Sequence, residues 1–272
     1  MSDKALTYAQ YLKIDELLEL SQPQSSEHDE PLFIAIHQVY ELWFKQILWE
    51  IARAQRLLEG GDSFGALGTL GRIRTILKTC VSQLDILETM TPLQFNSFRD
   101  RLTSGSGFQS AQFRELEAVL GRRDHAGAGA AAGTGMGMSE HLVPGSIPRA
   151  RVEAAMARPS MWDSTLRYLA GRKHAFPDDI LERDVTLPYG GDERVQSTLL
   201  TVHRTDPEAG LVCEALVDID EGLQEWRYRH VKMVERTIGN KSGTGGSSGV
   251  GYLSSTLFHS VFPDLWAIRT QF

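Results

Sequence analysis

Cysteine is nearly absent from this sequence: the chain of 272 residues has two, Cys80 and Cys213. They lie far apart, each within an apolar helical pattern, so we expect two reduced thiols in the core rather than a disulfide. The sequence also lacks the Cys-x-x-Cys-His string that attaches haem covalently, a cysteine pair for zinc and a His-Glu-x-x-His motif. These absences exclude a disulfide scaffold and the common zinc motifs.

Long apolar runs and clustered basic residues are missing as well. No uncharged apolar run reaches the length of about 18 residues that a membrane span needs, and the polar start Met1-Ser2-Asp3-Lys4 does not resemble a secretory signal. We therefore expect a cytoplasmic protein without a membrane partner. The 28 Lys and Arg against 35 Asp and Glu give a net charge of −7, which argues against a nucleic-acid partner.

Runs of alternating polar and apolar residues long enough for a sheet are absent too, whereas helical patterns are strong. From residue 30 to 59 apolar residues recur every three or four positions, which predicts one long helix. Asp29 is a candidate cap, Pro31 suits the first turn, and Gly60-Gly61 ends the pattern. A second helix is predicted for residues 64–87, and Thr91-Pro92 begins a third that runs toward Leu102.

The rest of the chain combines shorter predicted helices with two glycine-rich stretches and a mixed aromatic and apolar segment at residues 252–272. Shorter helices are expected at residues 108–120, 160–170, 178–184 and 192–203, and Asp206-Pro207 opens a second long helix to residue 238. The Gly/Ala-rich range 121–148 reads as a flexible loop, and residues 239–251 contain six glycines. The sequence has no internal repeat, so we predict a single all-α domain spanning residues 1–272.

Two of the eight histidines, His37 and His230, lie on or beside the apolar stripe of a long helix and are flanked by aromatic residues. A single such histidine is most often a core residue bonded to a carbonyl or carboxylate, and two raise the odds of a site only modestly. His230 could ligate haem iron, with Arg227 and Arg229 near the propionates. The simpler interpretation makes both arginines solvated helix charges.

Arg99 follows Phe95 and Phe98 and precedes a Ser/Gly-rich turn. An arginine beside an apolar pocket suits a bidentate carboxylate contact, although an ordinary surface salt bridge explains the pattern equally well. Residues 239–251 do not form a phosphate loop, because Lys241 precedes the glycine-rich part instead of following it and a helix leads in. That stretch is either a linker or a loop that folds over a ligand.

Taken together, these strings resemble the tryptophan 2,3-dioxygenase family, and the similarity covers nearly the whole chain apart from the Gly/Ala-rich loop. The most specific string is Trp226-Arg227-Tyr228-Arg229-His230-Val231, followed by the glycine-rich stretch. The other matching strings are residues 8–18, 28–38, 41–45, 90–93, 98–99, 106–110 and 112–114.

The resemblance implies a helical bundle that encloses a b-type haem, active with ferrous iron, in a homotetramer. It implies insertion of both atoms of O2 across the indole C2–C3 bond of L-tryptophan, which gives N-formylkynurenine. His230 matches the proximal iron ligand, and His37 matches the distal histidine that accepts the indole N–H. Phe33 matches a residue that lines the indole pocket, and Arg99 matches the arginine that binds the substrate carboxylate.

Further matches concern the edges of the pocket. Thr244 corresponds to the residue that holds the substrate ammonium, so residues 239–251 are expected to order over the substrate. Ser106 and Gly107 fall on the O2 side of the haem. The N-terminal segment, residues 1–20, corresponds to an exchanged helix that completes a neighbouring subunit's pocket; its matching residues are Tyr8, Tyr11 and Leu12.

The chain departs from the family pattern at three places. Phe95 stands where bacterial relatives often have a tyrosine that assists Arg99, the turn before Ser106 lacks its usual Pro-Ser pair, and the Gly/Ala-rich loop is unusual. An alternative is therefore a secondary-metabolism paralogue that oxygenates a substituted tryptophan, inserting one oxygen atom to give a 2-oxindole. A sensor that binds haem or tryptophan without turnover is a third interpretation, disfavoured by the presence of His37, Arg99, Thr244 and His230 together.

Overall fold

A computed structural model describes residues 6–102, 109–123, 138–140, 142–239, 241, 250–255 and 257–272. Throughout this part of the chain, every regular element is a helix, which confirms the all-α prediction. The α-helices are α1 (Tyr8–Leu12), α2 (Ile14–Leu18), α3 (Glu30–Glu59), α4 (Ser63–Leu87), α5 (Pro92–Arg99), α6 (Ala111–Leu120), α7 (Ile147–Met156), α8 (Met161–Gly171), α9 (Asp178–Leu181), α10 (Glu193–Thr205), α11 (Pro207–Ile238), α12 (Val250–Ser255) and α13 (Pro263–Ala267), with 3₁₀ turns at Asp100–Leu102 and Ile268–Gln271.

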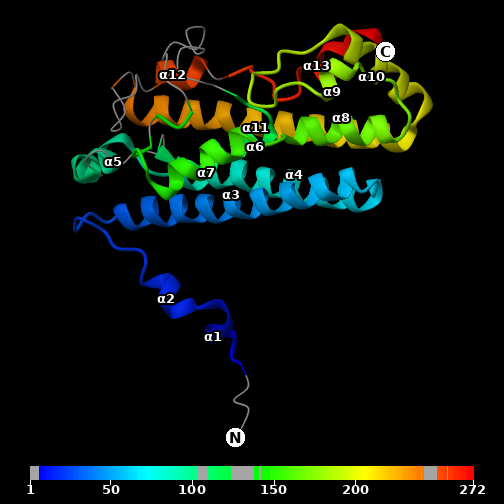
Figure 1. Ribbon diagram of the computed structural model, residues 1–272. Coiled ribbons are helices and arrows are strands. Elements are labelled where there is room, and N and C mark those ends of the chain that lie inside the picture. The colour runs from blue at the N-terminus through cyan, green and yellow to red at the C-terminus, as the bar shows by residue number, and fades with distance from the viewer. Residues whose placement is uncertain are drawn as a thin grey trace, which may run out of the picture.

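Three long helices, α3, α4 and α11, form the centre of the molecule. Figure 1 shows α3 and α4 side by side and α11 lying along them, with α5 at one end and α10 and α13 at the other. The apolar stripe of α3 faces this core, and Ile47, Ile51 and Leu58 are almost fully buried. Burial of such stripes is the main stabilising term for a helical bundle.

The start of α3 differs from the prediction. The side chain of Asp29 makes no capping hydrogen bond. Instead, the buried Glu30 carboxylate accepts hydrogen bonds from the backbone N–H groups of Gln24 and Ser25, each at 2.8 Å. The side chain of Glu30, the first residue of α3, therefore holds the preceding turn, and Asp29 does not cap the helix.

The N-termini of α4 and α11 follow the ordinary capping rules. Asp62 accepts from the backbone N–H of Gly65 at 2.8 Å, and Asp206 accepts from that of Ala209 at 3.2 Å.

Cys80 on α4 and Cys213 on α11 are free and buried, as expected, and burial raises the pKa of both thiols to about 12.

A second layer of shorter helices covers α3 and α11, and the helices α7, α12 and α13 were not predicted. Helix α7 begins after the Ser146 cap and buries only Val152, Ala155 and Met156, so its apolar pattern is weak. Other boundaries moved by a few residues: α6 starts at Ala111 because Ser110 caps it, accepting from the Phe113 N–H at 3.2 Å.

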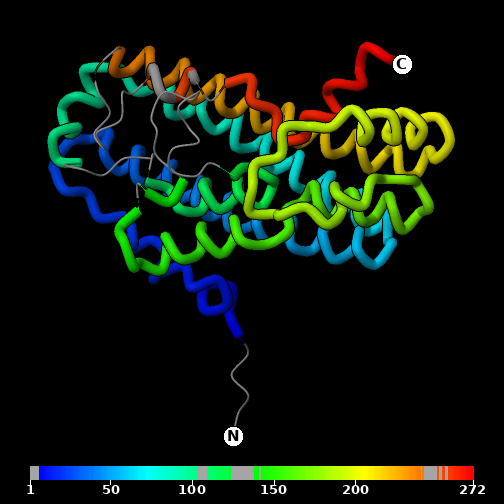
Figure 2. The backbone as a smooth tube through the Cα atoms, turned by 45° about the horizontal axis from the view of Figure 1, so that its top comes forward, coloured from blue at the N-terminus to red at the C-terminus, as the bar shows by residue number. Residues whose placement is uncertain are grey.

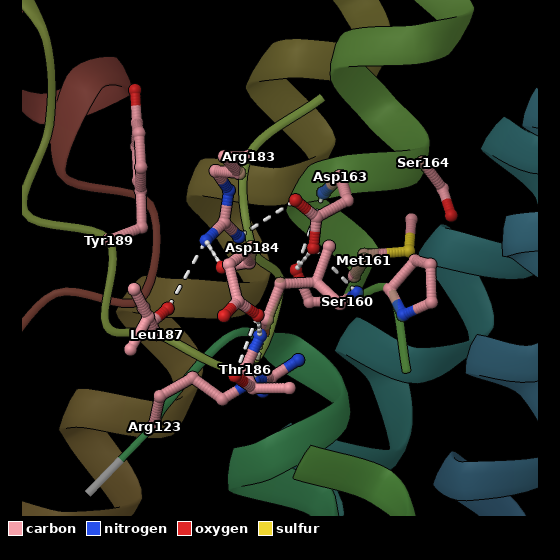
Figure 3. Close-up of polar contacts among 12 residues, drawn as sticks. Arg123, Ser160, Met161, Asp163, Ser164, Arg183, Asp184, Thr186, Leu187 and Tyr189 are labelled. Atoms are coloured by element: carbon pink, nitrogen blue, oxygen red, sulfur yellow. Dashed lines mark hydrogen bonds and ion pairs between the residues drawn. The ribbon is translucent and has the colours of Figure 1, made fainter. Parts of the chain in front are cut away.

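Buried polar contacts join α8 to the segment after α9 within this layer (Figure 3). The Arg183 guanidinium lies 2.7 Å from an Asp163 carboxylate oxygen, and the other carboxylate oxygen accepts from the Ser160 hydroxyl at 2.7 Å. Of the range 121–148, predicted as a flexible loop, residues 124–137 and 141 lie outside the described part. The described flanks pack into the protein, because Arg123 and Met138 are buried.

The N-terminal helices α1 and α2 stand away from the body of the molecule in both views (Figures 1 and 2). Neither helix has a buried residue, and the large apolar side chains of both helices are exposed to solvent. The described helices include none that is both long enough and apolar enough to cross a membrane.

Candidate functional site

His37 lies near the start of α3, one helical turn after Phe33 and on the same face of the helix. Its ring centroid is 4.1 Å from that of Phe33, and its Nδ1 is 2.7 Å from the Phe33 carbonyl oxygen. Because a carbonyl can only accept, Nδ1 carries the proton and Nε2 keeps a lone pair. Burial lowers the pKa of His37, while the Phe33 carbonyl and the Glu41 carboxylate oppose that shift. The imidazole is therefore a neutral acceptor at neutral pH.

Helix α5 supplies an aromatic wall beside this histidine. The Phe33 ring lies 5.7 Å from Phe95 and 5.7 Å from Phe98, and the last two are 5.4 Å apart, edge to face. Arg99 follows in the last turn of α5 and is partly buried. The structure thus brings Phe33, His37 and Phe95 together and places Arg99 on the helix that carries the wall.

His230 lies on α11, one turn after Trp226, and stacks on it with a centroid distance of 5.1 Å and an interplanar angle of 8°. Burial, followed by the charges of His37 and Arg114, lowers the pKa of His230 to about 4. The same Trp226 ring lies 6.0 Å from Tyr40, so this part of α11 packs against α3. Within the described residues, neither ring nitrogen of His230 has a hydrogen-bond partner.

These properties fit a haem ligand. Haem iron takes a neutral imidazole nitrogen, and the low pKa leaves His230 unprotonated with an available lone pair. The sequence could not identify an acceptor for the second ring nitrogen, and none lies within the described part of the chain.

The interpretation of Arg227 as a solvated helix charge is wrong, whereas Arg229 does lie at the surface. Arg227 is buried, and its Nη2 lies 2.6 Å from Glu117. Arg229 is partly exposed and pairs with Asp85 at 2.6 Å. Burial without a partner would be costly for the Arg227 guanidinium, and the Glu117 carboxylate supplies that partner.

Sequence reasoning missed the buried ion cluster around Glu117, one helical turn beyond Phe113 on α6. Its carboxylate lies 2.7 Å from Arg114, 2.8 Å from Arg122 and 2.6 Å from Arg227. Burial alone would raise the pKa of Glu117, but the arginines outweigh it and hold the pKa far below its usual range. The available signal was a glutamate beside the apolar residues of α6.

A second missed feature is the aromatic packing between α3, α6 and α11. The Trp226 ring lies 4.8 Å from Phe113, 5.9 Å from Phe44 and 6.0 Å from Tyr40. Phe113 belongs to a matched string, and Trp226 precedes His230 by one turn, so both could have been noted. Their contact with each other could not, because it joins distant parts of the sequence.

The other predicted site residues are not gathered at His37. Ser106, Gly107 and Thr244 lie outside the described residues. Tyr8, Tyr11 and Leu12 belong to the projecting segment and do not approach the α3 and α5 wall of their own chain (Figure 1).

Comparison with known proteins gives one consistent result. A family model described as tryptophan 2,3-dioxygenase matches residues 1–128 and 208–272. A tryptophan 2,3-dioxygenase of Anaeromyxobacter sp. (strain K) is 57% identical over 97% of this chain and 96% of its own length. Proteins of the same name from Herpetosiphon aurantiacus and Caulobacter vibrioides are 54% and 43% identical; each alignment covers 98% of this chain, and 99% and 98% of the respective relative.

Proposed function

The chain belongs to the tryptophan 2,3-dioxygenase family, and we propose that it is a haem-dependent enzyme that cleaves the indole C2–C3 bond of L-tryptophan with O2 to give N-formylkynurenine. The observation that carries this proposal is the placement of two imidazoles on packed helices. His37 of α3 lies against Phe33, and His230 of α11 stacks on Trp226, whose ring packs against Tyr40 of α3. The first offers an acceptor for the indole N–H and the second an iron-binding group.

His230 would hold haem b through one ring nitrogen, with Trp226 fixing the plane of its imidazole. When bound, ferrous haem supplies the O2 chemistry. The residues of the chain have to bind the substrate and orient it.

The substrate is a zwitterion with an apolar ring, and each part needs its own contact. Phe33 and Phe95 offer aromatic surface to the indole, and the Nε2 lone pair of His37 accepts the indole N–H. Arg99 binds the carboxylate, since burying that charge without a partner would cost several kcal/mol. We assign Thr244 to the ammonium group, and Ser106 and Gly107 to the oxygen side of the pocket, from the family match of their strings.

The N-terminal segment fits a role in assembly. Tyr8 and Tyr11 are 76% and 72% exposed, and Leu12 is 41% exposed, which is unusual for residues of this size in an isolated chain. We propose that they pack against the pocket of a neighbouring subunit in a homotetramer. The cytoplasmic location expected from the sequence stays a prediction.

The test is the mass of the product. Reduced, haem-loaded protein incubated with L-tryptophan under ¹⁸O2 should give N-formylkynurenine with two labelled atoms, and an anaerobic control should give none. A product with one labelled atom and a 2-oxindole ring, or turnover of substituted tryptophans alone, would replace this assignment with the secondary-metabolism activity. Binding of tryptophan without oxygen uptake would indicate a sensor.

A further inference from the structure

Glu41 links the helix of His37 to the N-terminus of α6. It lies on α3 one turn after His37 and is partly buried. One carboxylate oxygen accepts from the Ser110 hydroxyl at 2.5 Å, and the other accepts from the Gln112 side-chain amide at 2.8 Å. The same amide also donates to the Glu41 backbone carbonyl at 2.8 Å. A charged acceptor held by two donors from one neighbouring element is a strong local tie.

The tie continues through α6 to the other histidine. Ser110 also caps α6 by accepting from the Phe113 N–H at 3.2 Å. The Phe113 ring packs 4.8 Å from Trp226, and Trp226 stacks on His230 at 5.1 Å. Glu41 therefore belongs to a continuous path of contacts from α3 through the first turn of α6 to the imidazole on α11.

We propose that Glu41 is a positioning residue, which fixes His37 relative to α6 and the Trp226–His230 stack by tying α3 to Ser110 and Gln112. This inference rests on the proposed function, because it concerns the orientation of an indole bound to His37. The Glu41 carboxylate touches neither substrate nor cofactor in this role, and its effect passes through His37. Small displacements of an orienting group can slow a reaction strongly.

The test is a double-mutant cycle on the haem-loaded enzyme, with kcat/KM for L-tryptophan as the measurement. If Glu41 acts through His37, Glu41→Ala should lower kcat/KM on the order of tenfold in the wild-type background, given the strength of charged hydrogen bonds. In the His37→Ala background the same change should have less than about a twofold effect, because effects of residues that act together are not additive. Glu41→Gln, which keeps an acceptor for Ser110, should recover most of the activity.

Glu50 is a matched control on the same helix. Its carboxylate also accepts from a glutamine, Gln46, at 2.8 Å, and it pairs with Arg72 at 3.0 Å, but none of these residues contacts the aromatic wall. Glu50→Ala should change kcat/KM by the same factor whether or not His37 is present. Gln112→Ala removes the hydrogen bond to Glu41 from the α6 side, so it should lower kcat/KM in the same background-dependent way as Glu41→Ala. It provides the test if Glu41→Ala does not fold.

The second readout is the preference for L-tryptophan over its N1-methyl derivative, which reports the contact of His37 with the indole N–H. Glu41→Ala should weaken this preference and Glu50→Ala should not. Equal effects of Glu41→Ala in both backgrounds, or an unchanged preference, would overturn the positioning role while leaving the proposed activity intact. A wild-type enzyme that does not turn over tryptophan would overturn both.

Discussion

Replacing Glu117 with glutamine removes the carboxylate that joins Arg114, Arg122 and Arg227, and leaves the shape of the side chain nearly unchanged. Glu117 is 1% exposed, and the three guanidinium groups lie 2.6 to 2.8 Å from its oxygens. Their side chains are only 5 to 15% exposed, so water cannot replace the lost charge. Breaking a buried ion pair from one side costs about 3–5 kcal/mol in the free energy of unfolding.

At about 2–4 °C per kcal/mol for a protein of this size, that loss corresponds to a fall in Tm of roughly 6–20 °C. The assay is thermal unfolding of the haem-loaded protein at pH 7, followed by circular dichroism. Glu153→Gln is the matched control: Glu153 on α7 pairs with Arg149 at 2.7 Å, and the two side chains are 49% and 26% exposed. An exposed pair is worth about 0–1 kcal/mol, so its Tm should hardly change.

The pH dependence has a definite sign. The folded-state pKa of Glu117 lies below its usual value, so its contribution to stability is complete above the unfolded-state pKa of about 4.3 and declines as the pH falls further. The difference in Tm between wild type and Glu117→Gln should therefore be full at pH 7 and shrink below about pH 4. Equal Tm values for the two proteins at pH 7 would refute the claim that the cluster is a desolvated ion network.

Three other substitutions test the assigned roles. His230→Ala should abolish most haem binding, seen as loss of the ferrous absorption spectrum; a spectrum like that of the wild type would place the iron ligand elsewhere. Arg99→Leu should retain haem but lower kcat/KM by a factor on the order of 30 to several thousand, from a lost charge pair of about 2–5 kcal/mol, and equal efficiency would move the carboxylate site. His37→Ala should slow turnover without abolishing it and weaken discrimination against N1-methyltryptophan, whereas complete inactivity with normal haem and substrate binding would make His37 an essential proton carrier.

The long helices were predictable because their signals are local. The apolar period of α3 and the Gly60-Gly61 stop gave its bounds of Glu30 and Glu59. Thr91 and Pro92 likewise marked the start of α5, where Thr91 and Gln94 form a capping box. Helix α7 was not predicted, because few of its residues are buried and it follows a Gly/Ala-rich stretch.

The polar contacts between helices were not predictable, because they join residues that are distant in sequence. Glu117 and Arg227 are separated by 110 positions, and Glu41 and Ser110 by 69. Periodicity shows that Glu117 lies among apolar residues, but not which cations reach it. His37 is an intermediate case, since its partner, the Phe33 carbonyl, lies one turn away on the same helix. The tautomer followed only from the observed distance.

Arg123 connects α6 to the segment between the two ranges that the family model matches, residues 1–128 and 208–272. Arg123 is buried at the end of α6, and its guanidinium donates to the backbone carbonyls of Ala118, Arg158 and Val185. Every residue supplies a backbone carbonyl, so this contact constrains the path of the chain at 158 and 185 but not the side chains there. One arginine in the matched region can thus hold the second layer against α6 with little demand on the sequence of that layer. Helices α3, α5 and α11, which carry the candidate site, have no such freedom, because their contacts are made by specific rings and charges.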